Sequence, residues 1–338
     1  MVTMQIRHAM DLKTLRAKLL LLGLLFLASS SSSATCFGQS PEAMETIRVD
    51  SDLVDLKVSV VWLNPQNSAS ELQQSDFLVL EDGKPQEISF FAGESAPFDL
   101  VLLLDLSGSI SEKLKLLRRS AKRFVEATRP MDRVAIVTFS DRPQVVSPLT
   151  LDRKQLLNSI DDIEKPLGGT KFWDSLGYVL DTFLPAGHAT RRCAVVAMTD
   201  GVDNALADVA GEGSQMPFAD LLEKLTRSDS IVFPIFLDTE KEEVKRHRSP
   251  SSAYVTARAQ LAQLADVSGT RVYTAKELKD LDQVYDQVIK DVGTVYSVGY
   301  RSTNTLRDGK WRSVLVQVKS RSDVTAYTKR GYFTRIDQ

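Results

Sequence analysis

The strongest constraint on the fold is an alternation of fully apolar segments with amphipathic ones between residues 98 and 292. Short apolar runs of this kind are typical of buried strands, and they occupy 98–105, 133–139, 193–200, 231–238 and 270–275, with a further short strand near 144–147. Helical periodicity covers 111–128, 152–163, 174–184, 217–228, 254–267 and 276–292. Buried strands alternating with helices predict an α/β fold: a doubly wound, mainly parallel six-stranded sheet with helices on both faces.

The two flanks of this unit are predicted to contain strands only. Residues 45–95 alternate apolar and polar side chains, and Asp82-Gly83 indicates a turn between strands. Residues 294–335 repeat this pattern, with Val314, Val316 and Val318 on one face. Each flank alone offers two or three strands, which is marginal for a stable sheet. We therefore expect both flanks to pair into one small sandwich-like β-domain, with the α/β unit inserted between them.

Residues 1–38 have the composition of a secretory signal peptide. Four basic residues and one acidic residue are followed by the apolar run 19–28 and by small residues through Gly38. The apolar run is shorter than the roughly 20 residues that span a bilayer. The sequence predicts export to the periplasm, the cell envelope or the extracellular space, with cleavage after Gly38. Membrane contact is expected only if the signal is retained or Cys36 is lipidated, and Ser33 makes the surrounding lipidation motif a poor one.

These patterns predict four segments. They are a signal peptide (1–38), the first part of the β-domain (39–97), the α/β domain (98–292) and the second part of the β-domain (293–338).

The charge balance argues against nucleic acid as a partner. The chain has 42 Lys and Arg and 44 Asp and Glu, and loss of residues 1–38 would leave a net charge of about −5. Nucleic acids and anionic membranes select basic surfaces instead. Cys193 would be the one remaining cysteine, and its apolar surroundings indicate core packing without a disulfide framework.

Oxygen-bearing side chains follow two of the predicted strands. Asp105, Ser107 and Ser109 come just after the first strand, and Asp200 follows the strand 193–200. Thr170 lies between them in a Gly-Gly-Thr loop. Ligands of open α/β sheets bind outside the carboxyl ends of the strands, so these side chains converge if the two strands are neighbours. Such a set of oxygens suits a hard cation such as Mg²⁺.

This combination of D-x-S-x-S, a distant Thr and T-D-G resembles the metal-ion-dependent adhesion site of von Willebrand factor A domains over residues 98–292. All five positions match: Asp105, Ser107, Ser109, Thr170 and Asp200. The resemblance implies Mg²⁺ or Mn²⁺ held through the three hydroxyls, with both aspartates acting mostly through water or outer hydrogen bonds. The flanks, with FLVLEDGKPQEISFF and YSVGY before KRGYF, resemble secreted bacterial proteins of the acidobacterial von Willebrand factor A-related type.

The predicted function is an exported, non-enzymatic, adhesion-type protein-binding module. Neutral ligands leave the charge of a cation under-neutralised, so an exposed Asp or Glu of an unknown partner protein can complete its shell. Two alternatives stay open: a structural or envelope-assembly protein whose metal only stabilises the domain, and a metal-dependent phosphoryl-transfer enzyme. The second is weaker because Ser107 replaces the general acid, and the chain lacks G-x-S-x-G and Walker A motifs. No small-molecule substrate is expected, and His188 and His247 are interpreted as surface residues.

Several segments near the site have a less definite interpretation. Asp203 and Asn204 either line its rim or, as the favoured reading, form a solvated turn. Lys171, Phe172 and Trp173 either contact a partner or lie buried beneath their loop. The charged segment 239–252 is predicted to be an exposed loop, and Ser111 is expected to cap the following helix. The helix 276–292 is expected to transmit movement to the second domain, with Gly293 as a hinge.

Overall fold

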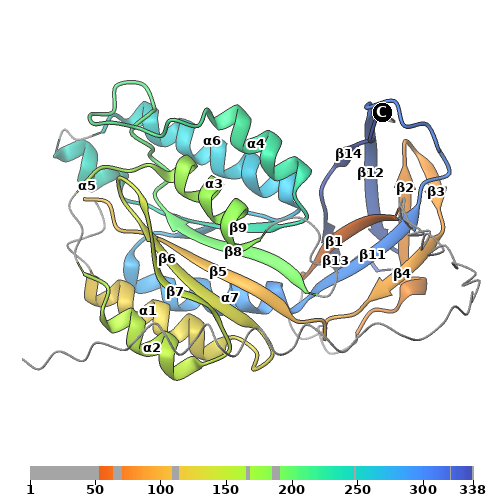
Figure 1. Cartoon of the computed structure of the whole chain (residues 1–338), viewed down its shortest axis with the longest axis horizontal. Helices are drawn as coiled ribbons and strands as arrows, with labels where there is room; N and C mark the ends of the chain where they lie inside the picture. The colour runs from red at the N-terminus through yellow and green to blue at the C-terminus, as the bar shows by residue number, and fades with distance from the viewer. Residues whose placement is uncertain are drawn as a thin grey trace, which may run out of the picture. The chain divides into compact units, whose positions relative to one another are not determined.

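The computed structural model describes residues 53–63, 71–108, 114–164, 168–184, 191–246, 249–319 and 321–336. All of these residues belong to one unit, Ser51–Gln338. This unit contains one six-stranded sheet and two four-stranded sheets (Figure 1). None of its described helices is long and apolar enough to cross a membrane. The predicted signal peptide and Cys36 lie outside the described residues.

The six-stranded sheet confirms the predicted α/β fold. Its strand order is β10-β9-β8-β5-β6-β7, with every neighbouring pair parallel except β6 and β7. Every residue of β5, β8 and β9 is buried, as expected for strands covered on both faces. The bounds are β5 (Phe98–Asp105), β6 (Arg133–Phe139), β7 (Pro143–Thr150), β8 (Arg192–Thr199), β9 (Ile231–Leu237) and β10 (Tyr273–Ala275).

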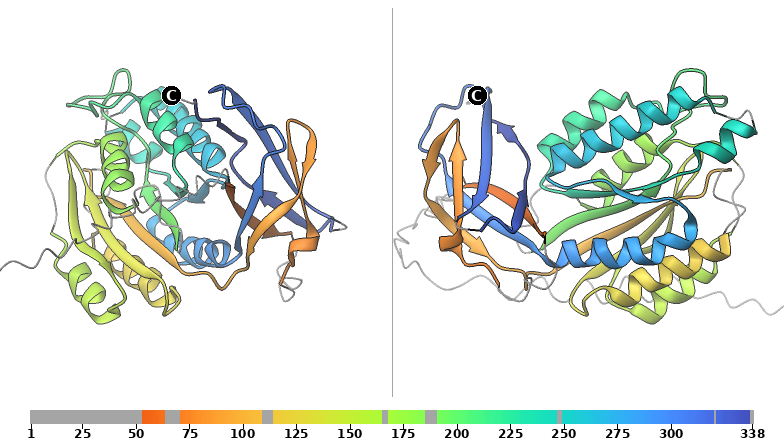
Figure 2. Two further views of the ribbon diagram at one scale, coloured as in Figure 1. Left: turned by 45° about the vertical axis from the view of Figure 1, so that its right-hand side comes forward. Right: turned by 180° about the vertical axis from the view of Figure 1, so that it is seen from behind.

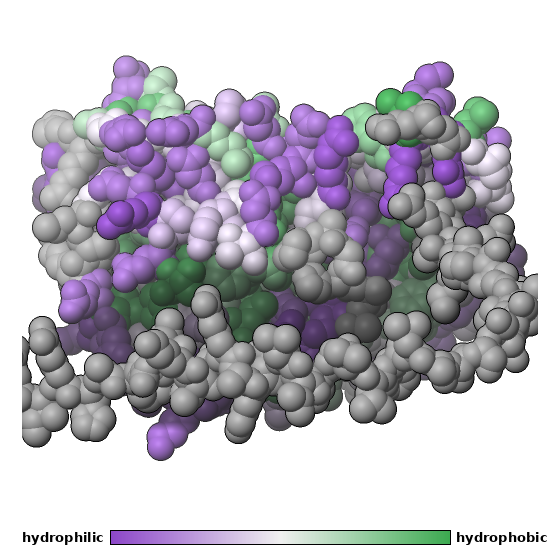
Figure 3. Space-filling model, in the orientation of Figure 1, coloured by the Kyte–Doolittle hydropathy of each residue, from purple (hydrophilic) through white to green (hydrophobic). Residues whose placement is uncertain are grey.

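Helices cover this sheet in two layers, which Figure 1 shows above and below it. One layer consists of α1 (Leu114–Ala127), α2 (Arg153–Asp161) and α7 (Leu281–Gly293), and the other of α3 (Phe172–Phe183), α4 (Phe218–Arg227) and α6 (Ser251–Ser268). Alternate residues of β5 enter two separate cores, Leu102 on the α1 side and Leu103 on the α3 side. The outer surface over α4 and α6 is mainly hydrophilic (Figure 3).

The flanks form two facing antiparallel sheets, each built from strands of both flanks (Figure 2). Their orders are β13-β1-β11-β4 and β14-β12-β2-β3. The bounds are β1 (Leu53–Trp62), β2 (Phe77–Glu81), β3 (Lys84–Gln86), β4 (Ile88–Ala92), β11 (Val295–Arg301), β12 (Trp311–Val318), β13 (Val324–Tyr327) and β14 (Gly331–Phe333). Val58, Val79, Val298 and Val316 share one core, so the predicted sandwich is confirmed, whereas its exact domain limits stay a prediction.

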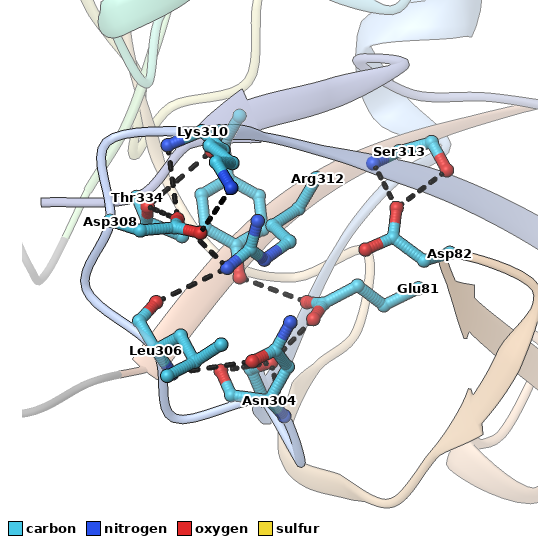
Figure 4. A network of polar contacts seen from close by, with 11 residues as sticks. Glu81, Asp82, Asn304, Leu306, Asp308, Lys310, Arg312, Ser313 and Thr334 are labelled. Atoms are coloured by element: carbon cyan, nitrogen blue, oxygen red, sulfur yellow. Dashed lines mark hydrogen bonds and ion pairs between the residues drawn. The ribbon is translucent and has the colours of Figure 1, made fainter.

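A buried polar network joins the strands of this sandwich (Figure 4). The Glu81 carboxylate accepts hydrogen bonds from the Tyr300 hydroxyl at 2.7 Å, the Tyr332 hydroxyl at 2.9 Å and the Ser302 hydroxyl. Nearby, Arg312 forms an ion pair with Asp308 at 3.0 Å. Glu81 therefore ties β2 to β11 and β14 on the inner side of the sandwich.

Two predictions about local structure are wrong. The segment 239–252 is not an exposed loop, because it contains α5 (Glu240–Lys245), with Glu243 buried, and the first residues of α6. Glu243 pairs with Arg246 within the segment, and Glu240 pairs with Arg258 of α6, so helix formation leaves these charged side chains paired. The last helix begins at Leu281 after a short 3-10 turn at Leu278–Asp280, five residues later than expected. Gly293 is its final residue, and transmission through this helix stays a prediction.

Candidate metal-binding site

The candidate site lies at the carboxyl ends of β5 and β8. These strands are parallel neighbours, with Leu104 opposite Met198, so Asp105 and Asp200 leave the sheet at the same edge. The condition for convergence, that these two strands are neighbours, is therefore met. Both carboxylates are buried, with exposed fractions of 0% for Asp105 and 3% for Asp200. Burial of two acidic groups at one edge is costly unless hydrogen bonds or a cation compensate.

Neutral donors hold the two carboxylates in place. Asp105 accepts from the Ser107 backbone N–H at 2.8 Å and from the Thr199 hydroxyl at 2.6 Å. Asp200 accepts from the Val202 N–H at 3.1 Å and from the Thr239 hydroxyl at 2.7 Å. These bonds fix both carboxylates without neutralising their charge.

The electrostatics of the site favour a cation. Burial, followed by the negative charge of Asp200, raises the pKa of Asp105 to about 7. Hydrogen bonds from Thr199 and Ser107 oppose this rise but do not cancel it. A divalent cation beside the pair would offset the repulsion that raises the pKa. The donor set, which combines hydroxyls with two carboxylates, also consists of the hard oxygen ligands that Mg²⁺ and Mn²⁺ prefer.

Ser107 and Thr170 are both buried, while Ser109 lies in 109–113, outside the described residues. The loop of Thr170 is fixed to its neighbours through its backbone. The Gly169 N–H donates to Asp141 at 2.6 Å, and the Lys171 N–H donates to the Ser140 carbonyl at 2.9 Å. Thr170 itself bonds with Asn204, four residues after Asp200. The structure thus links the Thr170 loop directly to the Asp200 loop.

No cluster of three or more His, Cys, Asp or Glu side chains that could hold a metal occurs in the part of the chain that the structure describes. This finding does not test the predicted site, because three of its five residues are hydroxyl ligands. The roles of Asp105, Ser107, Ser109, Thr170 and Asp200 as a metal site therefore stay a prediction.

The favoured reading of Asp203 as part of a solvated turn is wrong. Its side chain is fully buried, and it accepts from the N–H groups of Trp173 and Ala205 at 3.1 and 2.9 Å. It also accepts from the Ser214 N–H at 2.9 Å and from the Ser214 hydroxyl at 2.6 Å. The position of Asp203, three residues after Asp200 in a Gly-containing loop, was the available sequence signal.

Of the two alternatives for Phe172 and Trp173, partner contact or burial, the structure shows burial. Phe172 and Trp173 lie in the core beneath the loop, and Lys171 pairs with Glu212 at 2.9 Å. The Phe172 ring packs against Phe139. Phe172 and Trp173 are therefore not available to a partner. Ser111, His188 and His247 lie outside the described residues.

Comparisons with known proteins agree with this architecture. The profile of the von Willebrand factor type A domain matches residues 99–287, more than half of the chain.

Among solved structures, the chain is 18% identical to proximal thread matrix protein 1 of the mussel byssus, with a TM-score of 0.45, over 59% of this chain and 48% of that one. It therefore spans about half the length of the mussel protein. It is 15% identical to the von Willebrand factor domain of the pilus tip protein Mfa5 from Porphyromonas gingivalis, with a TM-score of 0.45, over 58% and 95% of the two chains. It is 13% identical to a variant of the minor pilin PilB from Streptococcus sanguinis, with a TM-score of 0.46, over 59% and 62%.

Proposed function

The chain belongs to the von Willebrand factor type A domain family, and from this premise we propose that it is an exported, non-enzymatic adhesion module. In this proposal a divalent cation, Mg²⁺ or Mn²⁺, binds at Ser107, Ser109 and Thr170. Asp105 and Asp200 act through water and outer hydrogen bonds. The cation then attracts an exposed Asp or Glu of a partner protein. The flanking strands continue the resemblance to secreted proteins of the acidobacterial type.

The observation that carries the proposal is the pair of buried carboxylates, Asp105 and Asp200, at adjacent strand ends. Each accepts hydrogen bonds from neutral donors, a backbone N–H and a threonine hydroxyl, which hold the carboxylates in place without neutralising them. When bound, the cation supplies electrostatic attraction for a carboxylate. The residues of this chain supply its position.

Metal binding is tested by isothermal calorimetry on full-length protein freed of metal with EDTA. We expect Mg²⁺ and Mn²⁺ to bind, and Asp105→Ala to abolish binding while the far-UV circular dichroism stays native. A suitable control is Asp238→Ala, because Asp238 is exposed and follows the neighbouring strand β9. Unchanged metal affinity in Asp105→Ala would refute the site.

Partner recognition is tested by capture from an envelope extract, first with Mg²⁺ and then with EDTA. Loss of a partner in EDTA, with the domain still folded, supports adhesion. Retention of the same partner in EDTA favours the structural alternative. Turnover of p-nitrophenyl phosphate that depends on Mg²⁺ and is lost in Asp105→Ala would favour the phosphoryl-transfer alternative.

A further inference from the structure

Asn204 forms two hydrogen bonds with the same residue of the neighbouring loop. Its side-chain oxygen accepts from the backbone N–H of Thr170 at 2.6 Å, and its backbone N–H donates to the Thr170 carbonyl at 2.9 Å. The Asn204 amide nitrogen also donates to the Ala210 carbonyl. Both polar atoms of this side chain are therefore hydrogen-bonded to backbone groups of the protein. Asn204 connects two loops and is not part of a solvated turn.

The surrounding glycines leave room for this side chain. A Cβ atom at Gly169 would lie 3.0 Å from the Asn204 amide nitrogen, and one at Gly211 would overlap it. Gly211 also has a φ of 107°, a backbone conformation that residues with a side chain rarely adopt. Glycines of two loops thus approach the Asn204 side chain closely.

The neighbouring residue, Asp203, fixes the backbone beside Asn204. Its carboxylate bonds to the first turn of α3 through Trp173 and to the following loop through Ser214. Asn204 can therefore not shift without breaking the contacts of Asp203 next to it. Because α3 begins two residues after Thr170, both contacts act on the same segment.

We propose that Asn204 is a positioning residue that sets the distance between Thr170 and Asp200 and so determines the cation affinity of the site. The inference rests on the proposed function and goes further, since no position of the adhesion motif includes Asn204. A metal ligand must be held in place to bind well, and loss of an outer hydrogen-bond partner typically costs 10- to 100-fold in metal affinity.

The test compares three variants of full-length protein by Mn²⁺ titration, followed by calorimetry and by electron paramagnetic resonance of free Mn²⁺. Asn204→Ala removes the bond to Thr170, and we expect its Kd for Mn²⁺ to rise about 10- to 100-fold. Asn204→Asp keeps an oxygen that accepts from the Thr170 N–H but loses the donor to the Ala210 carbonyl, so its Kd should lie clearly below that of Asn204→Ala. Asn158→Ala, at an exposed position of α2, is the matched control and should bind as wild type does.

The titration is done at a temperature where circular dichroism shows each variant to be folded, so that lost stability does not imitate lost affinity. If wild type binds Mn²⁺ and Asn204→Ala binds it equally well, the inference is wrong while the proposed function stands. If Asn204→Asp loses as much affinity as Asn204→Ala, the bond to Thr170 is not what sets affinity, and the inference is again wrong. Wild-type protein that binds no Mn²⁺ overturns the proposed function and this inference with it.

Discussion

Arg192 offers a sharp test of how the α/β sheet is joined to the sandwich. It is the first residue of β8, yet its guanidinium reaches strands of the other sheet system. Its Nε donates to the Ser297 hydroxyl at 3.1 Å, and one terminal nitrogen donates to the carbonyls of Ala92 and Gly93 at 2.9 and 2.5 Å. Only 2% of Arg192 is exposed. We predict that its replacement strongly destabilises the protein.

The magnitude follows from the groups left behind. Burial, with the positive charge of Arg129 in second place, lowers the pKa of Arg192 to about 10, so the side chain is still charged at pH 7. Arg192→Met keeps most of the apolar stem and leaves two carbonyls and one hydroxyl without their donor, each at about 1–3 kcal/mol. Relief from burying the charge offsets part of this cost. We expect a loss of about 2–3 kcal/mol for Arg192→Met and about 3–5 kcal/mol for Arg192→Ala, which also creates a cavity.

The assay is urea unfolding at pH 7, followed by tryptophan fluorescence and circular dichroism. The chain has three tryptophans, with Trp173 in the α/β unit and Trp62 and Trp311 in the sandwich. Ser297→Ala serves for comparison, because it removes the acceptor of the Arg192 Nε–H alone and should cost about 1.5 kcal/mol, the lower end for a hydrogen bond to a charged group. A loss below 1 kcal/mol in Arg192→Met would refute the reasoning, since it would mean that the three acceptors find water when the guanidinium is gone.

Two further predictions concern other buried charges, Glu81 and Asp99. Tyr300→Phe removes a 2.7 Å hydrogen bond to the Glu81 carboxylate and should lower the free energy of unfolding by about 1.5–3 kcal/mol, whereas Tyr178→Phe on the surface of α3 should have little effect in the same urea titration. Burial alone would raise the pKa of Asp99, but hydrogen bonds from Arg133 and Arg191 and their charges together lower it below 3.8. The stabilisation by ionised Asp99 should therefore be complete above that pH and disappear as the pH falls through the lower folded value. The stability difference between wild type and Asp99→Asn, measured by urea unfolding, should be constant from pH 5 to 7 and shrink below pH 4. An equal difference at pH 3 and pH 7 would contradict this assignment.

The main features of the fold could be predicted because burial leaves a strong signal in the sequence. A run such as 100–104 can be apolar throughout only if both faces of its strand are covered, and that requirement already implies helices on both sides. The mixed sandwich followed from the expectation that neither flank has enough strands to bury a core alone. Each flank in fact contributes four strands, β1–β4 and β11–β14, and not the expected two or three, but the two sheets are still built from strands of both flanks. In both cases the need to bury apolar side chains, summed over many residues, decided the outcome.

Single polar positions were harder to predict, because their environment depends on distant residues. Asp203 is buried only because Trp173 and Ser214, 30 and 11 residues away, supply its donors. Glu243 is buried within a segment whose composition indicates an exposed loop. Such contacts have no local periodicity, and composition alone assigns these residues to solvent.

The candidate site could be recognised from the sequence, whereas the hydrogen bonds that connect its two loops could not. Asp105 and Asp200 must stand at strand ends to converge, so they follow strands that the sequence makes visible. Asn204 is under no such requirement: any residue on the loop that could reach Thr170 would serve, and its role is defined only when the two loops are seen bonded to each other. In the proposed site the sheet places the aspartates, and the distance between the two ligand loops is proposed to depend on residues that bond one loop to the other, such as Asn204. For this protein, variation in metal affinity among related chains should therefore be sought in loop residues such as Asn204 and not only in the five positions of the motif.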